Sequence, residues 1–128
     1  MRSTRELTDP ERILAMFEAA SNLGVVIEES NIDSYVYLLK VKEIPFKYSF
    51  VFHPLPYSAE LRRDILGLRM AGYIASASLI ITPKGSEFVR QTILPEFEEL
   101  LDTIGRYLEE FRLMDRTGLF EAVYARVV

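Results

Sequence analysis

Three arginines follow a serine in one short stretch of this chain. The chemistry and the spacing of these four residues suit them to bind phosphate or nucleic-acid bases. The stretch begins at Ser58, and Arg62, Arg63 and Arg69 follow it at helical spacing. Guanidinium groups bind phosphate oxygens and guanine edges, and the free N–H groups at a helix N-terminus attract anions. A helix over residues 58–71 would therefore be able to contact both the backbone and the bases of duplex DNA.

Charged neighbours give the same arginines a second interpretation. Glu60 and Asp64 lie within a turn of them, and opposite charges on a solvated helix face commonly pair. The sequence leaves these two interpretations evenly balanced. Lys47 before this helix and Lys84 after it are placed to reach DNA phosphates. The complete set of predicted DNA contacts is Ser58, Arg62, Arg63, Arg69, Lys84 and Lys47.

Charge is distributed unevenly along the chain. The 128 residues contain 15 Lys and Arg against 19 Asp and Glu, a net charge of −4. Residues 34–84 carry seven basic and three acidic side chains, a local charge of +4, which leaves −8 for the remainder. This distribution disfavours a protein that coats nucleic acid through bulk positive charge, yet it is compatible with a local basic patch.

Other chemistry finds little support in the residue types. The absence of Cys excludes disulfides, zinc ribbons and cysteine nucleophiles. His53 is the single histidine and has no Ser, Cys or His beside it, so we interpret it as structural or surface-exposed. The acidic pairs at 98–99 and 109–110 would point about 100° apart on a helix and would not converge. We expect no enzyme activity, no metal site and no cofactor.

Targeting and membrane signals are missing from the sequence. The N-terminus is charged without an apolar segment, and the longest uncharged stretch, residues 70–83, is too short to span a bilayer. We therefore expect a cytoplasmic protein with no membrane contact. Asn and Gln total only three and Cys is absent, a composition that indicates a thermophilic source.

The apolar pattern predicts a mainly helical chain. The first helix spans residues 9–23, with a cap at Thr8 or Asp9 and Gly24 after its end. A second begins at Asn31 or Asp33 and stops before Pro45, and the arginine-bearing helix begins at the cap Ser58. Residues 47–53 read as a short strand or extended segment. Its alternate aromatic side chains fill the core in the favoured interpretation and form a stacking surface for bases or a partner in the other. Residues 73–75 and 79–81 then predict a minimal β-hairpin after the arginine-bearing helix.

The last third of the chain predicts a long helix that begins at Thr82 and Pro83, with Pro95 as a possible kink. Its apolar residues follow a heptad spacing. Such a seam would leave much apolar surface exposed on a small monomer, which predicts a homodimer. A short amphipathic helix over residues 119–124 follows. The predicted dimer interface is Phe97, Leu101, Ile104, Leu108 and Phe111.

The order of these elements is typical of a winged-helix domain, in which the helix before the hairpin enters the major groove of DNA. We expect a mainly α fold with a short β-hairpin: one domain over residues 1–128, made of a winged-helix-like unit (9–85) and a helical dimerisation segment (86–128). The turn at residues 76–78 carries no Arg or Lys. The wing would therefore be short and uncharged.

The middle of the chain resembles known families. Residues 44–61, with Asp64-Ile65, Leu68, Gly72-Tyr73-Ile74 and the preceding Tyr37-Leu38-Leu39, resemble the YwgA-like proteins and, more distantly, the Panacea-type antitoxin domain. Leu55 stands where those families usually have glycine, and Glu28-Glu29-Ser30-Asn31 replaces their basic residues. Residues 81–85 resemble the junction between wing and last helix in MarR- and PadR-like regulators. The resemblance implies a winged-helix-like fold that binds either DNA or protein.

Three functions follow from these patterns. The first is a homodimeric, DNA-binding transcriptional regulator of the winged-helix type. The alternative is an antitoxin-like or adaptor module that keeps the winged-helix shape and binds a protein partner without reading DNA; the overall acidity, the uncharged wing and the family resemblance favour it. A weaker third is a small-molecule sensor with an aromatic and Met-lined pocket beside the long helix.

Overall fold

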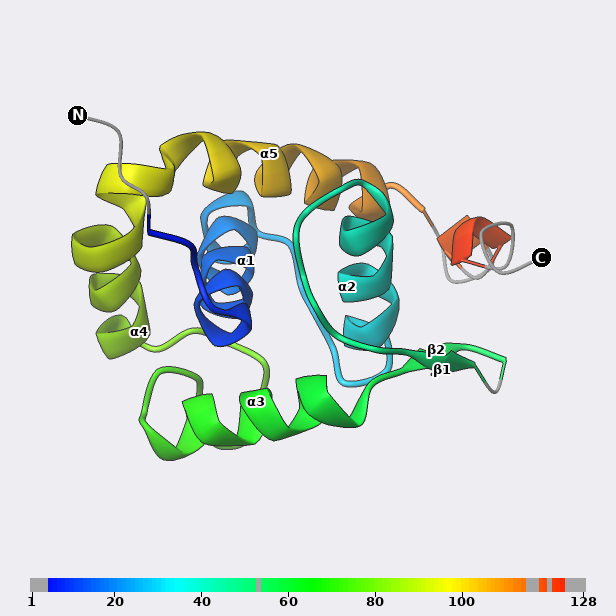
Figure 1. Ribbon diagram of the computed structural model, residues 1–128, viewed down its shortest axis with the longest axis horizontal. Coiled ribbons are helices and arrows are strands. Elements are labelled where there is room, and N and C mark those ends of the chain that lie inside the picture. The colour runs from blue at the N-terminus through cyan, green and yellow to red at the C-terminus, as the bar shows by residue number, and fades with distance from the viewer. Residues whose placement is uncertain (1–4, 53, 115–117, 120, 124–128) are drawn as a thin grey trace.

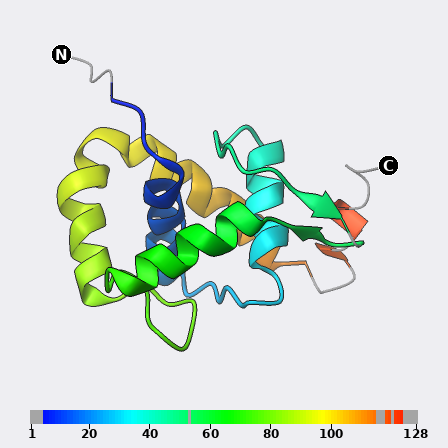
Figure 2. The same cartoon turned by 60° about the horizontal axis from the view of Figure 1, so that its bottom comes forward.

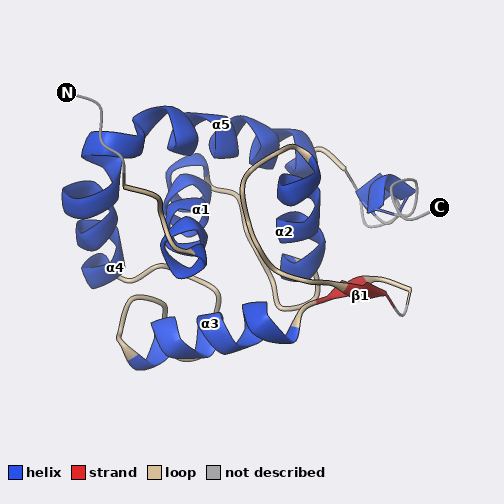
Figure 3. Ribbon diagram, in the orientation of Figure 1, coloured by secondary structure: helices blue, strands red, loops and turns tan. Residues whose placement is uncertain are grey.

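We describe the protein from a computed structural model, which covers residues 5–52, 54–114, 118–119 and 121–123. The chain is mainly helical, with a two-stranded antiparallel hairpin and a long C-terminal helix, as the sequence predicts (Figures 1 and 3). No helix in the described residues is long and apolar enough to cross a membrane. His53 lies outside the described residues.

Helix α1 (Asp9–Leu23) lies at the centre of the fold, with the other helices around it (Figure 1). Its start is a capping box, in which the Thr8 side chain accepts from the N–H of Glu11 and the Glu11 side chain accepts from the N–H of Thr8. It ends at Gly24, whose φ of 70° suits glycine. Residues 12–20 are all buried. The predicted bounds are confirmed.

Helices α2 (Ile32–Val41) and α3 (Ala59–Met70) also lie where the sequence predicts them. The α2 helix ends four residues before Pro45, its inner side chains are buried, and it packs against α5 and β2. Ser58 caps α3 by accepting a hydrogen bond from the N–H of Leu61. The predicted stripe of Leu61, Ile65 and Leu68 is buried, so α3 presents its remaining sides to solvent.

The segment between α2 and α3 is extended, and its side chains alternate inward and outward. Ile44, Phe46 and Tyr48 are buried, and the Phe50 and Phe52 rings meet Tyr37 edge-on at 5.5 and 5.1 Å between ring centres. The predicted core role of this aromatic face is confirmed. Regular pairing is limited to β1 (Val51–Phe52) and β2 (Pro56–Tyr57), so the predicted strand over residues 47–53 is only two residues long.

The sheet thus lies before α3, whereas the prediction placed a hairpin after it. Residues 73–81 contain only one antiparallel bridge, between Ile74 and Ile81. The pairing cannot extend because Thr82 turns the chain into the next helix: its hydroxyl accepts from the N–H of Gly85 and donates to the carbonyl of Gly72. That helix packs so closely that a Cβ on Gly85 would lie 2.3 Å from the carbonyl oxygen of Tyr73.

The last helical stretch runs through α4 (Pro83–Phe88), a π-helical turn η1 (Val89–Ile93) and α5 (Leu94–Arg112). Pro95 has no N–H and cannot complete the regular ladder. The N–H of Leu94 instead bonds the carbonyl of Val89, five residues back, and Phe97 leaves the helical conformation with φ −129° and ψ 33°. The predicted kink near Pro95 is confirmed.

The heptad seam of α5 lies in the core of the same chain. Leu101, Ile104, Leu108 and Phe111 are at most 7% exposed, because α5 lies across α1 and α2. Phe97 is partly buried beside the Arg5 guanidinium. For four of the five residues predicted to form a dimer interface, the premise of an exposed apolar seam is therefore wrong, because these side chains already have partners within the monomer.

The final predicted helix is present in outline. Residues 118–119 and 121–123 are helical, and Val123 is 1% exposed. Phe120 and Tyr124, predicted as spaced partners in this helix, lie outside the described residues. Core side chains from residues 9–85 and from residues 86–128 form one continuous hydrophobic cluster.

Candidate functional site

Two of the three predicted DNA-binding arginines are held by carboxylates of the same chain. Arg62 donates from Nη1 to Glu29 Oε2 at 2.7 Å, and its Nη2 bonds Asp33 Oδ1. Arg69 donates from Nη2 to Glu29 Oε1 at 2.8 Å and from Nε to the carbonyl of Ala75 at 3.1 Å. The Glu29 carboxylate is thus clamped between two guanidinium groups, and neither arginine presents a free fork to a ligand.

This ion-pair cluster fastens α3 to the start of α2. The hydrogen bond from Arg69, together with the charges of Arg69 and Arg62, lowers the pKa of Glu29. Asp33 is only 5% exposed, and it also accepts a hydrogen bond from the N–H of Ser58 at 2.9 Å. A buried carboxylate requires such partners, so the cluster has a structural role.

The carboxylates predicted as partners of the arginines have other contacts. Glu60 accepts from the backbone N–H of Ser49 at 2.9 Å, and Asp64 accepts from the hydroxyl of Tyr48 at 2.6 Å. The interpretation that the arginines are paired is thus confirmed for Arg62 and Arg69, but with partners about 30 to 40 residues away in the chain. Helical spacing alone contains no information about such contacts.

Three further predicted DNA contacts have polar partners within the same chain. Ser58 is 1% exposed and uses its hydroxyl oxygen and N–H for the helix cap and for Asp33. Lys84 donates to the carbonyl of Ala71 at 2.8 Å. Lys47 pairs with Glu6 at 3.3 Å, which lowers the pKa of that carboxyl. The Lys47 side chain is 70% accessible.

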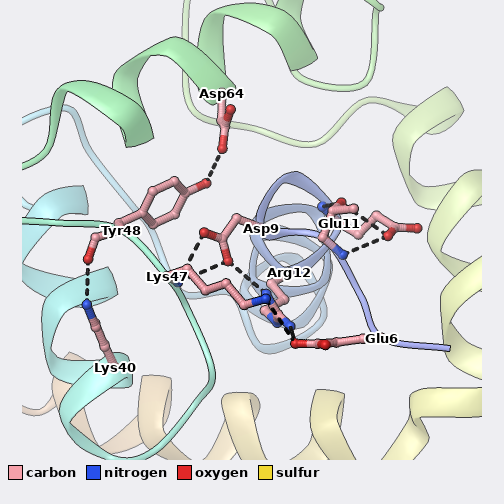
Figure 4. Close-up of polar contacts among 9 residues, drawn as sticks. Glu6, Asp9, Glu11, Arg12, Lys40, Lys47, Tyr48 and Asp64 are labelled. Carbon is pink, nitrogen blue, oxygen red and sulfur yellow. Dashed lines mark hydrogen bonds and ion pairs between the residues drawn. The ribbon is translucent and has the colours of Figure 1, made fainter. Parts of the chain in front are cut away.

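The surroundings of Lys47 form a second polar network, shown in Figure 4. Arg12 is 1% exposed and donates to Asp9 Oδ1 at 2.8 Å and to Glu6 Oε1 at 3.2 Å. Asp9 also accepts from the backbone N–H of Lys47. Burial and then the hydrogen bond to Asp64 raise the pKa of Tyr48. This network joins the extended segment to α1 and α3, and its carboxylates are all partnered.

Arg63 differs from the other predicted contacts. It is exposed, and its side chain makes no hydrogen bond or ion pair with any described residue. Leu66 and Met70 follow it at helical spacing and are 57% and 81% exposed. We call the surface of Arg63, Leu66, Gly67 and Met70 the α3 outer face. It is an apolar strip with one unpaired guanidinium group.

Apolar side chains are also exposed at both ends of α3. The cross-strand pair Val51 and Tyr57 is 54% and 47% exposed, whereas the neighbouring pair, Phe52 and Pro56, is better covered. The hairpin extends beyond the N-terminal end of α3 (Figure 2). Ile80, in the loop after α3, is 61% exposed. Sequence reasoning missed this surface, although Leu66 and Met70 fall outside the buried stripe of α3.

A groove of about 920 Å³ lies on another side of the molecule, between α1, α4, η1 and α5. Glu18 of α1 lines it and is only 6% exposed. The hydroxyl of Ser86 donates to Glu18 Oε1 at 2.6 Å. Sequence reasoning missed Glu18 too, because it lies within the apolar run of α1 and has no charged neighbour there.

No protein-family model, curated protein or solved structure matches this chain. Across the described residues, no three His, Asp or Glu side chains gather as ligands of a metal ion. The function must therefore be argued from the geometry of the α3 outer face and its surroundings.

Proposed function

We propose that this chain is a protein-interaction module of winged-helix-like shape, which binds a partner protein through the α3 outer face and the adjoining hairpin. The observation that carries the proposal is the composition of the α3 outer face. A DNA-reading helix presents polar side chains to base edges. Here Leu66 and Met70 point outward with Arg63 as the one arginine beside them, while Arg62 and Arg69 are paired internally.

The order of the elements supports the winged-helix-like part of the proposal. Helix α3 is followed by the antiparallel bridge between Ile74 and Ile81, and then by the long helical stretch that begins at Pro83. A helix followed by a minimal wing and then by another helix is the order of elements in the winged-helix class. The resemblance of residues 34–90 to the YwgA-like and Panacea-type antitoxin families supports the same arrangement and a protein partner.

The chemistry of the α3 outer face defines the partner. Met and Arg are enriched at protein interfaces, and a flexible Met adapts to an apolar counterpart. The partner should supply apolar side chains against Leu66 and Met70 and a carboxylate opposite Arg63. Enclosed by such a contact, the pair of Arg63 with the carboxylate would be shielded from water and would help to set the orientation.

DNA binding by a homodimeric regulator is the second candidate, and the exposed Arg63 favours it. This residue lies in the first half of α3 and has no described polar partner. A single free arginine on that helix would neutralise few phosphates, so the dependence of binding on salt concentration should be shallow.

One experiment separates the two candidates. Duplex DNA is tested in a shift assay at low and at physiological salt, with the unmodified protein and with Arg63→Ala. In parallel, a photo-crosslinking amino acid is placed at Met70, with Glu87 on α4 as the matched exposed control. We expect no DNA shift and a protein adduct from position 70 only. A low-salt shift that Arg63→Ala abolishes would overturn the proposal and establish DNA binding.

A further inference from the structure

Glu18 is a nearly buried carboxylate that makes no ion pair with any described residue. Among those residues, only the hydroxyl of Ser86 bonds it, donating to Oε1 at 2.6 Å. The described residues give Oε2 no hydrogen bond or ion pair, and the side chain lines the groove between α1 and α5. An ionised carboxylate in such a place is costly unless a positive group pairs with it. Oε2 therefore offers a strong acceptor to a ligand in the groove.

The rest of the groove favours a positively charged ligand with a hydrocarbon part. Its walls carry four carboxylates against the two guanidinium groups of Arg90 and Arg106, a formal charge of −2. The apolar part of the wall can cover an alkyl chain, and the volume of about 920 Å³ is that of a small-molecule site. The apolar wall is formed by Ala19, Leu23, Val89, Leu94 and Leu101.

Neither arginine of the groove neutralises Glu18 in the structure. Arg106 donates to the hydroxyl of Thr103 at 3.2 Å, one turn earlier on α5. Arg90 lies in the π-helical turn, and its guanidinium group makes no hydrogen bond or ion pair with any described residue. The turn follows from Pro95, whose missing N–H forces the irregular ladder. Its residues Val89 and Arg90 line the groove.

We propose that this groove binds a primary alkylammonium group, which donates hydrogen bonds to Glu18 Oε2 while its carbon chain lies along the apolar wall. The site is separate from the α3 outer face and does not depend on the proposed function. The alkylammonium could come from a free polyamine or from a lysine side chain of a peptide. Both sources share the recognition chemistry, and the experiment distinguishes them.

The test is a titration followed by the amide signals of Ala19, Ser86 and Gly105 in ¹⁵N-labelled protein. n-Pentylamine and 1-pentanol have the same chain length and differ in charge. We expect the amine to bind about ten-fold or more tightly than the alcohol, as a charge-assisted hydrogen bond implies. Glu18→Gln should remove this preference, whereas Glu87→Gln, on α4 outside the groove lining, should keep it.

Spermidine and Nα-acetyl-lysine amide then identify the source. Tighter binding of spermidine indicates a free polyamine, and tighter binding of Nα-acetyl-lysine amide indicates a lysine side chain of a peptide. Equal affinities for pentylamine and pentanol, an unchanged preference in Glu18→Gln, or no saturable shift at millimolar amine would overturn the proposal. If Glu18→Gln does not fold, the comparison of amine with alcohol on the unmodified protein decides alone.

Discussion

Helices α3 and α5 both carry residues that the sequence predicts to face a partner, and the protein uses the two sets differently. Four of the five seam residues of α5 are buried in the core of their own chain, and Phe97 is partly buried. On α3, Arg62 and Arg69 turn toward Glu29, but Arg63, Leu66 and Met70 stay outside. A side-chain pattern shows that a helix needs partners; it does not show whether they belong to the same molecule.

The central position of α1 explains the difference. Its residues 12–20 are buried on every side, and a helix with that burial must be enclosed by others. The α5 helix lies across α1 and uses its seam for this purpose. Helix α3 borders α1 with a narrow stripe only, so most of its circumference remains on the surface. The candidate interaction surface is therefore on α3.

Truncating the seam should have the largest effect on stability. Leu108→Ala removes a side chain that is 0% exposed and leaves a cavity between α5 and its neighbours. We expect a loss of about 2–5 kcal/mol in the free energy of unfolding, measured by urea denaturation. The matched variant on α3, Leu66→Ala, should change it by less than about 0.5 kcal/mol.

Protein concentration provides the control for this prediction. If the seam is internal, the urea midpoints of the unmodified protein and of Leu108→Ala will not change with protein concentration. Midpoints that rise with concentration, together with a dimer in sedimentation, would show that α5 also stabilises an assembly.

Substitution of the α3 arginines should change the free energy of unfolding by different amounts, a large one for a paired arginine and a small one for the exposed arginine. Arg62→Ala leaves the buried Asp33 without its cation, and we expect a loss of about 1–3 kcal/mol in thermal or urea unfolding. Arg63→Ala should stay within about 0.5 kcal/mol of the unmodified protein, because it breaks no described contact. Similar losses in both variants would contradict the division of α3 into an inner and an outer side.

The smallest expected effect is the pH dependence contributed by Glu29. Its pKa is lowered in the folded state, so the protein binds fewer protons there than the unfolded chain does. The stabilisation is therefore present above the ordinary Glu pKa of 4.5 and is lost as the pH falls below that value.

Urea unfolding between neutral and acidic pH tests this effect. Because Glu29 is half exposed, its contribution should stay below about 1 kcal/mol and weaken with salt. Glu29→Gln should flatten the acidic decline, whereas Glu87→Gln should not. An identical pH profile for Glu29→Gln and the unmodified protein would show that the ionisation of Glu29 adds nothing to stability.

The helices were predictable because their signals are local. Thr8, Ser58 and Thr82 each cap the helix that follows, and Gly24 ends the first one at the predicted place. The position of the hairpin was not predictable, because β1 and β2 are each two residues long and their pairing depends on how the extended segment crosses α2. Short strands carry too little periodicity to mark their own position.

The candidate sites were predicted only in part for the same reason. The sequence predicted that α3 contacts a partner and named Arg63 among the contact residues, but it could not rank Arg63 above Arg62 and Arg69. That ranking depends on Glu29 and Asp33, which are distant in the chain. Glu18 was missed because its surroundings come from α4 and α5.

Helix boundaries, caps and the inward stripe of each helix follow from residues within a few positions of one another, and the amino-acid sequence alone specifies them. The choice of partner for every charged and apolar surface depends on contacts between residues tens of positions apart. The packing of the other helices around α1 determines these contacts. It buries most of the seam of α5, pairs two arginines of α3, and leaves Arg63, Leu66 and Met70 exposed to solvent.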